Sequence, residues 1–231
     1  MVMMYSWTEV WKLRTELYKF LGNCLLEPLA ASTANTLDGE IRENFPLEPA
    51  NRQMESGLEQ LRKCTADLKT IPPNEARQEV MVEYTILFLG PGRPKAPPWE
   101  SVYRTEGQLL FSRATYEVRK ILADNGLEMV EKNHQPEDHI GIELLALALM
   151  SENVQDVQER KEQKTRIGRQ ASFIDEHLLS WIPGLAQDAK QHGSLGYYGG
   201  LIELIWGILL WDRELLQEFL TQDEDLADIL V

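Results

Sequence analysis

The sequence predicts an all-α protein of roughly nine to ten helices, a helix content far above the average for globular proteins. Apolar residues recur at spacings of three and four along most of the 231-residue chain, whereas strand-type alternation is almost absent. Hydrophobic residues make up 43% of the chain, which is enough to form a core. We therefore expect one helical bundle-like domain over residues 1–231, in which the Pro-rich segment 90–99 is an internal loop and not a linker.

The overall charge narrows the classes of partner. A formal net charge of −14 repels nucleic-acid phosphates and favours cationic partners, although such a charge can also serve solubility alone. No apolar run reaches about 18 residues without a charge, so we expect no membrane span. The first residues lack the features of a signal peptide, and Cys24 and Cys64 have no metal-binding spacing. These features predict a cytoplasmic protein.

Helix start and stop signals divide the N-terminal half of the chain. Ser6 and Glu9 have the spacing of a capping box, and Pro28 ends the helix that they begin. The expected core face of this helix is Val10, Leu13, Leu17, Phe20 and Cys24. Residues 31–49 are weakly patterned. The next helix carries Met54, Leu58, Leu61 and Leu68.

A third helix begins at Pro72-Pro73 and ends at Gly90-Pro91. Its apolar stripe is Val80, Tyr84, Leu87 and Phe88. Four prolines then make residues 90–99 stiff and extended. Helix resumes near Gly107 and runs to Gly126, with one face formed by Leu110, Ala114, Val118 and Ile121.

In the C-terminal half, Pro136 suits the first position of a helix, and residues 140–150 are apolar on nearly all sides, which indicates a buried helix. A long helix follows, with Ile167, Ala171, Ile174, Leu178 and Trp181 in register. Pro183-Gly184 should break it. The last helix carries Leu201, Leu204, Ile205, Ile208 and Leu209, and an acidic tail occupies residues 223–228.

Two stretches are candidates for a binding site. The stripe Tyr84, Leu87 and Phe88 has the spacing of an ordinary core face, yet it precedes a stiff loop that carries Trp99 and Tyr103. Aromatic residues on a rigid loop beside an apolar helix end can line a groove for another chain. The stripe is therefore either core or groove wall.

The second stretch begins at Pro136. Asp138 falls near the third helical position, where a carboxylate caps free backbone N–H groups, and His139 suits the polar edge of a core. The functional alternative is that Asp138 and His139 face a cleft, so that the carboxylate can bind an incoming guanidinium. In that case Asp138→Ala should weaken binding without unfolding the protein.

Enzymatic alternatives have less support. A metal-dependent hydrolase could be built on His134, Asp138, His139 and Glu143, but the doubled histidine of a helical zinc motif is absent. The loop around Lys95 lacks the pattern of a phosphate-binding loop, and its prolines remove N–H donors. No nucleophile motif is present.

Both candidate stretches resemble blocks of a known family, the TorD/DmsD redox enzyme maturation chaperones. The first block runs from Tyr84-x-x-Leu87-Phe88 through Gly90-Pro91 to the segment Pro97-Pro98-Trp99-Glu100-Ser101-Val102-Tyr103. The second block is Pro136-x-Asp138-His139. The order and separation of the blocks match the family. Arg14 and Tyr18 in the first helix, and residues 173–181, also resemble it.

This resemblance implies an all-helical cytoplasmic chaperone that is not an enzyme and carries no cofactor of its own. Family members bind the twin-arginine leader, and often the apoprotein, of a molybdenum (or tungsten) oxidoreductase. They hold the precursor for insertion of molybdopterin before export. Some members form homodimers, and weak guanine nucleotide binding has been attached to some. The sequence does not identify the client enzyme.

Carried over by position, the resemblance assigns peptide binding to Tyr84, Leu87, Phe88, Trp99 and Ser101 in the first block and to Pro136, Asp138 and His139 in the second. The chemistry of a twin-arginine leader adds Glu100 and Glu137 as carboxylates and Tyr103 as an apolar contact to the expected peptide-binding residues. Gln135 stands where the family often has Glu, and Gly92 stands where some members have an aromatic residue. The chemistry suits a leader with two guanidinium groups and an apolar run, because carboxylates here adjoin apolar side chains.

Overall fold

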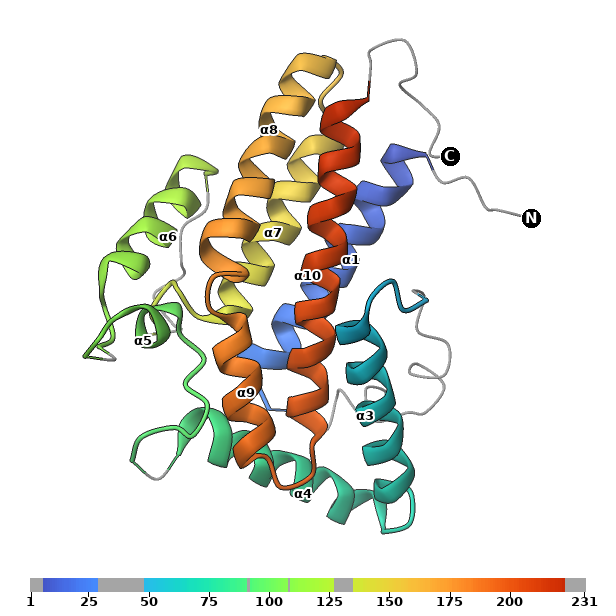
Figure 1. Cartoon of the computed structure of the whole chain (residues 1–231), viewed down its shortest axis with the longest axis vertical. Helices are drawn as coiled ribbons and strands as arrows, with labels where there is room; N and C mark the ends of the chain where they lie inside the picture. Colours follow the sequence, from blue (N-terminus) through green and yellow to red (C-terminus); the bar gives the residue numbers. More distant parts are fainter. Residues whose placement is uncertain (1–5, 29–47, 91, 108, 127–134, 223–231) are drawn as a thin grey trace.

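The computed structural model describes residues 6–28, 48–90, 92–107, 109–126 and 135–222. Within these residues the chain forms nine α-helices and two short π-helical segments, and the only β-type pairing is one isolated bridge between Trp99 and His139 (Figure 1). The all-α prediction is confirmed.

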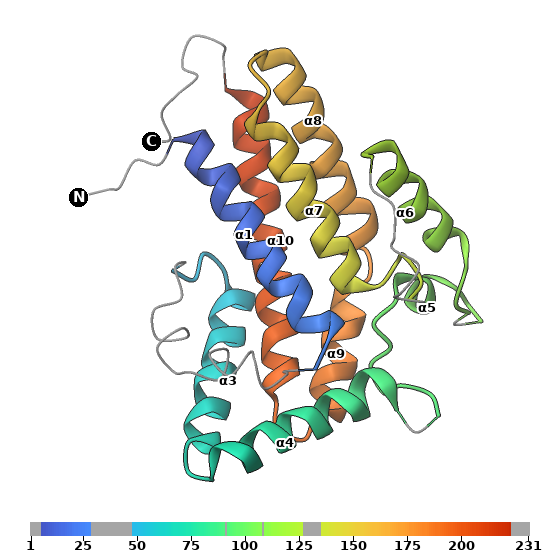
Figure 2. The ribbon, with the colours of Figure 1, turned by 180° about the vertical axis from the view of Figure 1, so that it is seen from behind.

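Four long helices form the body of the fold: α1 (Trp7–Leu26), α7 (Ile140–Gln155), α8 (Arg160–Phe173) and α10 (Tyr197–Thr221). In the views from front and back they lie side by side, with α1 packed along α7 (Figures 1 and 2). α10 extends beyond this bundle and provides the surface on which α3 (Arg52–Leu68) packs.

The remaining helices surround this body. α4 (Pro73–Tyr84) crosses one end of the molecule and continues as the π-helical segment η2 (Thr85–Leu89). The short α5 (Glu100–Arg104) and α6 (Arg113–Asp124) lie together on the side away from α3 (Figure 1).

A second π-helical segment prolongs α8. This segment, η4 (Ile174–Leu178), is followed by α9 (Ile182–His192), which packs against α10. π-helical turns inside α-helices occur frequently at functional sites. Of the two described π-helical segments, η2 is hydrogen-bonded to the loop that follows it, and η4 is hydrogen-bonded to α5.

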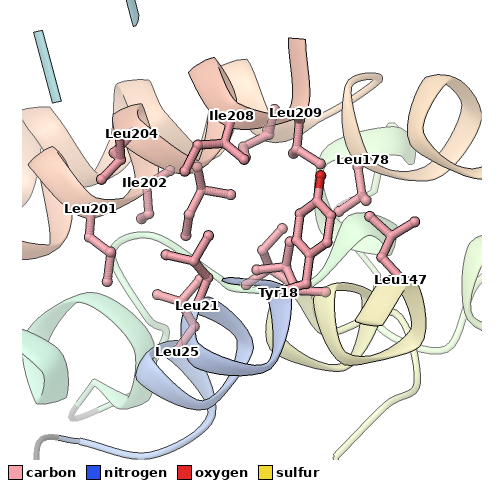
Figure 3. Packing of buried hydrophobic residues seen from close by; sticks show 14 of the residues in the cluster. Tyr18, Leu21, Leu25, Leu147, Leu178, Leu201, Ile202, Leu204, Ile208 and Leu209 are labelled. Atoms are coloured by element: carbon pink, nitrogen blue, oxygen red, sulfur yellow. The ribbon is translucent and has the colours of Figure 1, made fainter. Parts of the chain in front are cut away.

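The core contains side chains from the first helix to the last. Figure 3 shows Tyr18, Leu21 and Leu25 of α1 facing the apolar side of α10, with Leu147 and Leu178 completing the layer. The α10 residues labelled there are Leu201, Ile202, Leu204, Ile208 and Leu209. One buried cluster therefore includes residues from α1, α7, η4 and α10. The single domain over residues 1–231, with loop 90–99 internal, stays a prediction that this shared core supports.

The start of α1 confirms the predicted capping box. The Ser6 hydroxyl accepts a hydrogen bond from the Glu9 N–H at 3.3 Å, and the Glu9 carboxylate accepts one from the Ser6 N–H at 2.7 Å. The predicted core face is confirmed at Val10 and Leu17, which are buried, but Phe20 is 37% exposed and Leu13 is only half-buried. The buried face instead includes Arg14 and Tyr18.

α1 presents this face to the core because Arg14 has a partner in the last helix. Its guanidinium binds Asp212 through two nitrogens, Nε to Oδ1 at 2.6 Å and Nη2 to Oδ2 at 2.9 Å. Nη1 donates to the side-chain amide oxygen Oε1 of Gln170 at 2.8 Å and to the Ser151 hydroxyl at 3.2 Å, and the Tyr18 hydroxyl donates to Asp212 at 2.7 Å. This buried network joins α1, α7, α8 and α10.

Three predicted boundaries differ from the structure. Helix does not resume at Gly107: α5 occupies Glu100–Arg104, and α6 begins only at Arg113, so Leu110 is exposed. Pro136 is not the first residue of a helix, because α7 begins at Ile140. Pro183 does not break a helix but lies in the first turn of α9, where a proline costs no intrahelical hydrogen bond.

Other predicted features stand or lie outside the described residues. α4 begins at Pro73, and η2 ends just before Gly90, whose φ of 63° favours glycine, as the sequence indicated. α3 begins after the N-cap Asn51. Most of the weakly patterned segment 31–49, and the acidic tail 223–228, lie outside the described residues. None of the described helices has the length and apolar character needed to cross a membrane.

Candidate binding site

The loop that follows η2 is held first by η2 itself. The Ala96 N–H donates to the Leu87 carbonyl oxygen at 2.8 Å, and the Lys95 N–H donates to the Ile86 carbonyl oxygen at 3.4 Å. A π-helical turn shifts its carbonyl groups relative to a regular helix, so these carbonyls are available to the loop. The Pro-rich loop is therefore fixed against the end of α4–η2 and does not extend into solvent there.

The second block of the sequence holds the loop from another side. Trp99 and His139 pair as an antiparallel bridge, the Glu100 N–H donates to the Asp138 carbonyl oxygen at 3.0 Å, and the Ile140 N–H donates to the Pro98 carbonyl oxygen at 2.9 Å. The two blocks that resemble the chaperone family therefore meet in space. This pairing also explains why α7 begins late, because residues 137 and 138 form a turn and His139 is extended rather than helical.

Asp138 holds this junction together. Its Oδ2 accepts a hydrogen bond from the Ser101 N–H at 2.8 Å, and its Oδ1 accepts one from the Thr115 hydroxyl at 2.8 Å. The side chain is fully buried. Asp138 thus satisfies a free N–H of α5 rather than of its own helix, and its carboxylate is not open to a guanidinium in this conformation. The expectation of a carboxylate facing a cleft was wrong on this point.

His139 is the N-cap of α7. Its Nδ1 accepts a hydrogen bond from the Gly141 N–H at 3.0 Å, and its ring lies edge-on to Trp99 with the ring centroids 5.9 Å apart. Burial lowers the pKa of His139 to about 3, so the ring is neutral at ordinary pH. A neutral ring is what an acceptor at Nδ1 requires.

The stripe Tyr84, Leu87 and Phe88 belongs to the core. None of these three side chains is more than 2% exposed. The ring of Tyr84 contacts those of Phe88 and Tyr198 edge-on, and its hydroxyl donates to the Leu25 carbonyl oxygen at 3.1 Å. In this conformation these residues support the loop from the core and do not line an open groove.

A third set of contacts fixes α5 through Glu100. This fully buried carboxylate binds Arg104 through Oε1 and His177 of η4 through Oε2, at 3.0 Å from Nδ1. Arg104 also donates to the Glu176 carbonyl oxygen at 3.1 Å. These contacts attach α5 to η4, in addition to its attachment to the turn before α7.

Tyr103 attaches α5 to α9. Its ring lies 5.4 Å from that of Trp181, and its hydroxyl donates to Asp188 at 3.0 Å. A Cβ at Gly184 would lie 2.9 Å from the Tyr103 ring, so the close approach depends on glycine. Burial and the charge of Asp188 raise the pKa of Tyr103, which keeps the hydroxyl protonated as a donor.

Glu143 lies in the interior beside Glu100. Its side chain is fully buried, and its polar neighbours are the Glu100 carboxylate and the Trp181 indole; neither carboxylate oxygen makes a hydrogen bond of ordinary geometry to a described residue. Burial first, and the charge of Glu100 second, raise the pKa of Glu143 well above its usual range. This environment favours the protonated form of Glu143. Sequence reasoning considered Glu143 only as a metal ligand.

Few of the predicted contact residues are exposed to solvent. Trp99, Tyr103 and Glu137 are half-buried, whereas the others, including Ser101 and Pro136, are buried. Glu137 is held by Arg119 through two hydrogen bonds of 2.6 and 3.0 Å; its partial burial opposes this ion pair, which nonetheless lowers the pKa of Glu137.

The exposed apolar surface nearby lies on the outer side of α4–η2. Met81 and Val82 are each 44% exposed and Leu89 is 50% exposed, one helical face away from the buried stripe Tyr84, Leu87 and Phe88. Sequence analysis missed these residues because it assigned the apolar positions to one stripe. A helix with apolar residues on both faces is itself a signal that the second face has a partner.

A cavity of about 690 Å³ lies beside the junction, between α6, α7 and α8. Ile121, Met150 and Phe173 supply its apolar lining, and the cavity ends at Glu176 and His177 of η4. Its size is within the range of ligand sites. The cavity therefore reaches the residues that hold Arg104 and Glu100.

The geometry does not support the metal-dependent hydrolase. No group of three or more His, Cys, Asp or Glu side chains within the described ranges is arranged to hold a metal ion. Asp138 and His139 use their polar atoms to cap helices, and Glu143 is enclosed beside Glu100. His134, the remaining proposed ligand, lies outside the described residues.

Comparison with known proteins decides the family. A family model described as nitrate reductase delta subunit matches residues 49–187, a range that contains both blocks and every anchor of the loop. The chain belongs to this family. Its resemblance to the TorD/DmsD chaperones is also confirmed, because several relatives of the chain are named TorD chaperones.

Three such relatives are each named chaperone protein TorD. The protein of Vibrio parahaemolyticus is 28% identical over 200 residues, covering 83% of this chain and 89% of the relative. The protein of Vibrio cholerae is 28% identical over 148 residues, covering 64% and 67%. That of a Psychrobacter species is 23% identical over 220 residues, covering 92% and 96%. The family likeness therefore extends over most of the chain.

Proposed function

We propose that this chain is a cytoplasmic chaperone that binds the twin-arginine leader and the apoprotein of a molybdopterin-dependent oxidoreductase. It holds this precursor for cofactor insertion before export. Membership of the delta-subunit and TorD family supports a role as a maturation chaperone. The observation that carries the proposed site is the pairing of Trp99 with His139, which joins the two sequence blocks of the family.

The proposed peptide-binding residues then divide into two groups by exposure. Trp99 and Tyr103 offer part of their rings to a ligand, whereas buried residues such as Asp138 and Phe88 hold the loop in shape. A binding surface on a loop needs such support, because a site whose supporting residues are loose loses affinity. Substitution of the buried group will therefore change stability and binding together.

The apolar run of the leader has a matching surface in Met81, Val82 and Leu89. This exposed stripe adjoins the loop, because the loop is hydrogen-bonded to η2 at Ile86 and Leu87. An amphipathic or apolar segment that covers the stripe would bury surface that is otherwise exposed to water. The leader is disordered when free, so ordering it opposes binding, and we expect a dissociation constant of about 0.1–10 μM.

Isothermal titration calorimetry tests the proposal. The ligand is a synthetic peptide with two adjacent arginines followed by an apolar run, and a peptide with two lysines in their place is the comparison. We expect saturable binding of the arginine peptide and weaker binding of the lysine peptide, because a guanidinium binds carboxylates through two parallel hydrogen bonds. Absence of saturable binding to leaders from the co-expressed molybdoenzymes of the host would exclude the function.

Two surface variants locate the apolar contact. Val82→Asp should weaken binding of the arginine peptide by about tenfold, because it places a charge in the apolar surface. Leu110→Asp is the matched control, since Leu110 is 43% exposed, close to the 44% of Val82, but lies between α5 and α6. Equal effects of both substitutions would show that the α4–η2 stripe is not the contact surface.

A further inference from the structure

Arg104 is an arginine already bound to a buried carboxylate of the candidate site. Glu100 is fully buried, whereas the Arg104 side chain that binds it is 40% exposed. The guanidinium therefore reaches from solvent to an interior carboxylate. An arginine from another chain would have to make this same contact in order to bind Glu100.

The attachment of Arg104 is weak by the standard of the same molecule. Both of the hydrogen bonds recorded for Arg104, to Glu100 and to the Glu176 carbonyl oxygen, leave from the single nitrogen Nη1. By contrast, Arg14 binds Asp212 through two nitrogens, and its side chain is only 1% exposed. Two-nitrogen contacts are the strong form of an arginine–carboxylate pair, and partly exposed single contacts are readily replaced.

A second carboxyl group lies beside the first. Glu143 is fully buried next to Glu100 and the Trp181 indole, and its oxygens make no hydrogen bond of ordinary geometry in the described part of the chain. A buried polar group with poorly formed hydrogen bonds is costly, and two adjacent carboxyl groups repel each other when both are ionised. A guanidinium, with five N–H donors, could satisfy both carboxyl groups at once.

A cavity adjoins the residues that hold this pair. The cavity between α6, α7 and α8 is lined in part by Glu176 and His177, and these two residues hold Arg104 and Glu100 respectively. Asp124, Glu176 and Arg169 supply its charged lining. Because Arg104 is 40% exposed and Glu100 is buried, a side chain that approaches beside η4 meets Arg104 before Glu100.

We propose that Glu100 and Glu143 form a guanidinium-binding subsite that Arg104 occupies in the free protein, and that an arginine of the bound leader displaces Arg104. The inference rests on the proposed function and names the carboxylates that serve it. Arg104 then acts as an internal competitor, and the apparent affinity for the leader is reduced by the fraction of molecules in which the subsite is filled.

Three variants test the subsite with the arginine peptide and the lysine peptide defined above. Arg104→Ala should tighten binding of the arginine peptide by roughly three- to tenfold, because the competitor is lost. Glu143→Gln should weaken it by about tenfold or more, because the amide keeps only one acceptor oxygen and cannot ionise to pair with the guanidinium. Arg113→Ala removes an ion pair of the same i,i+4 spacing without a buried carboxylate, with Arg113 90% and Glu117 35% exposed, and should leave affinity unchanged.

Each outcome decides one of the two claims. If the wild-type protein binds the arginine peptide but Arg104→Ala binds equally or more weakly, the subsite is wrong and the chaperone function stands. If no form of the protein binds, the proposed function fails and the inference fails with it. Should Arg104→Ala lose its helical circular dichroism, Arg104→Gln, which keeps a polar side chain of similar length, provides the same comparison.

Discussion

The carboxylate of Asp138 binds the backbone of Ser101 across 37 residues of sequence, with the Ser101 N–H at 2.8 Å from Oδ2. Through this contact the turn before α7 fixes the start of α5, and α5 carries Glu100, Tyr103 and Arg104. Asp138, which the sequence suggested as a contact to the ligand, therefore positions the residues of α5.

Asp138→Ala should destabilise the protein as well as weaken leader binding. The substitution leaves the Ser101 N–H and the Thr115 hydroxyl buried without an acceptor, at a cost of about 3 kcal/mol in the free energy of unfolding. Chemical denaturation measures this. Glu137→Ala, which removes a partly exposed ion pair with Arg119, should cost less than about 1 kcal/mol. Equal stability of wild type and Asp138→Ala would contradict the role assigned here and restore a purely ligand-binding one.

His139 should make the fold sensitive to acid. The pKa of His139 is lowered from 6.5 to about 3 in the folded protein. Between these pH values the side chain is therefore protonated in the unfolded chain but neutral in the folded one. Its contribution to stability is present above pH 6.5 and is lost as the pH falls towards 3. His139→Asn keeps a side-chain acceptor at the N-cap.

Between these pH values the wild type should therefore lose stability relative to His139→Asn by up to about 1.4 kcal/mol per pH unit. Urea denaturation at a series of pH values gives the difference directly. Parallel stability curves for the two proteins would show that His139 is protonated in the folded state.

Glu143 should act in the opposite direction. Because its pKa is raised above 4.5 in the folded protein, its contribution to stability is present below that pH and is lost as the pH rises. Glu143→Gln resembles the protonated form and should be more stable than the wild type, by a margin that widens as the pH rises above 4.5. Thermal melts at a series of pH values provide the check, and a constant margin would argue against a raised pKa of Glu143.

The Arg14–Asp212 pair should be essential to the fold although it is distant from the loop. Removing either partner leaves a buried charge unpaired, so Arg14→Ala or Asp212→Ala should cost about 3–5 kcal/mol. The double variant Arg14→Met with Asp212→Leu should recover much of this loss, because apolar side chains of similar volume need no partner. If the double variant is as unstable as the single ones, packing rather than charge accounts for the effect.

Local signals explain which elements the sequence could predict. The capping box of Ser6 and Glu9, the proline that begins α4 and the glycine that ends η2 each depend on residues within one helical turn. Proline is ambiguous in this respect, because it either ends a helix or occupies its first turn. Pro183 was assigned the first role and has the second.

Long-range contacts explain what the sequence could not predict. The buried face of α1 depends on Asp212, which is 198 residues from Arg14, and the late start of α7 depends on pairing with Pro98 and Glu100. No local pattern carries these contacts. The sequence located the two blocks of the candidate site, but which of their residues are exposed follows only from the way the blocks pair.

Hydrogen–deuterium exchange with and without saturating arginine peptide tests the central claim, that the leader binds at the junction of loop, α5 and η4. The account predicts altered exchange at residues 93–104 and 174–178, and protection at residues 81–89, with little change along α3. Saturable binding that leaves all three segments unchanged and protects another part of the chain would contradict it.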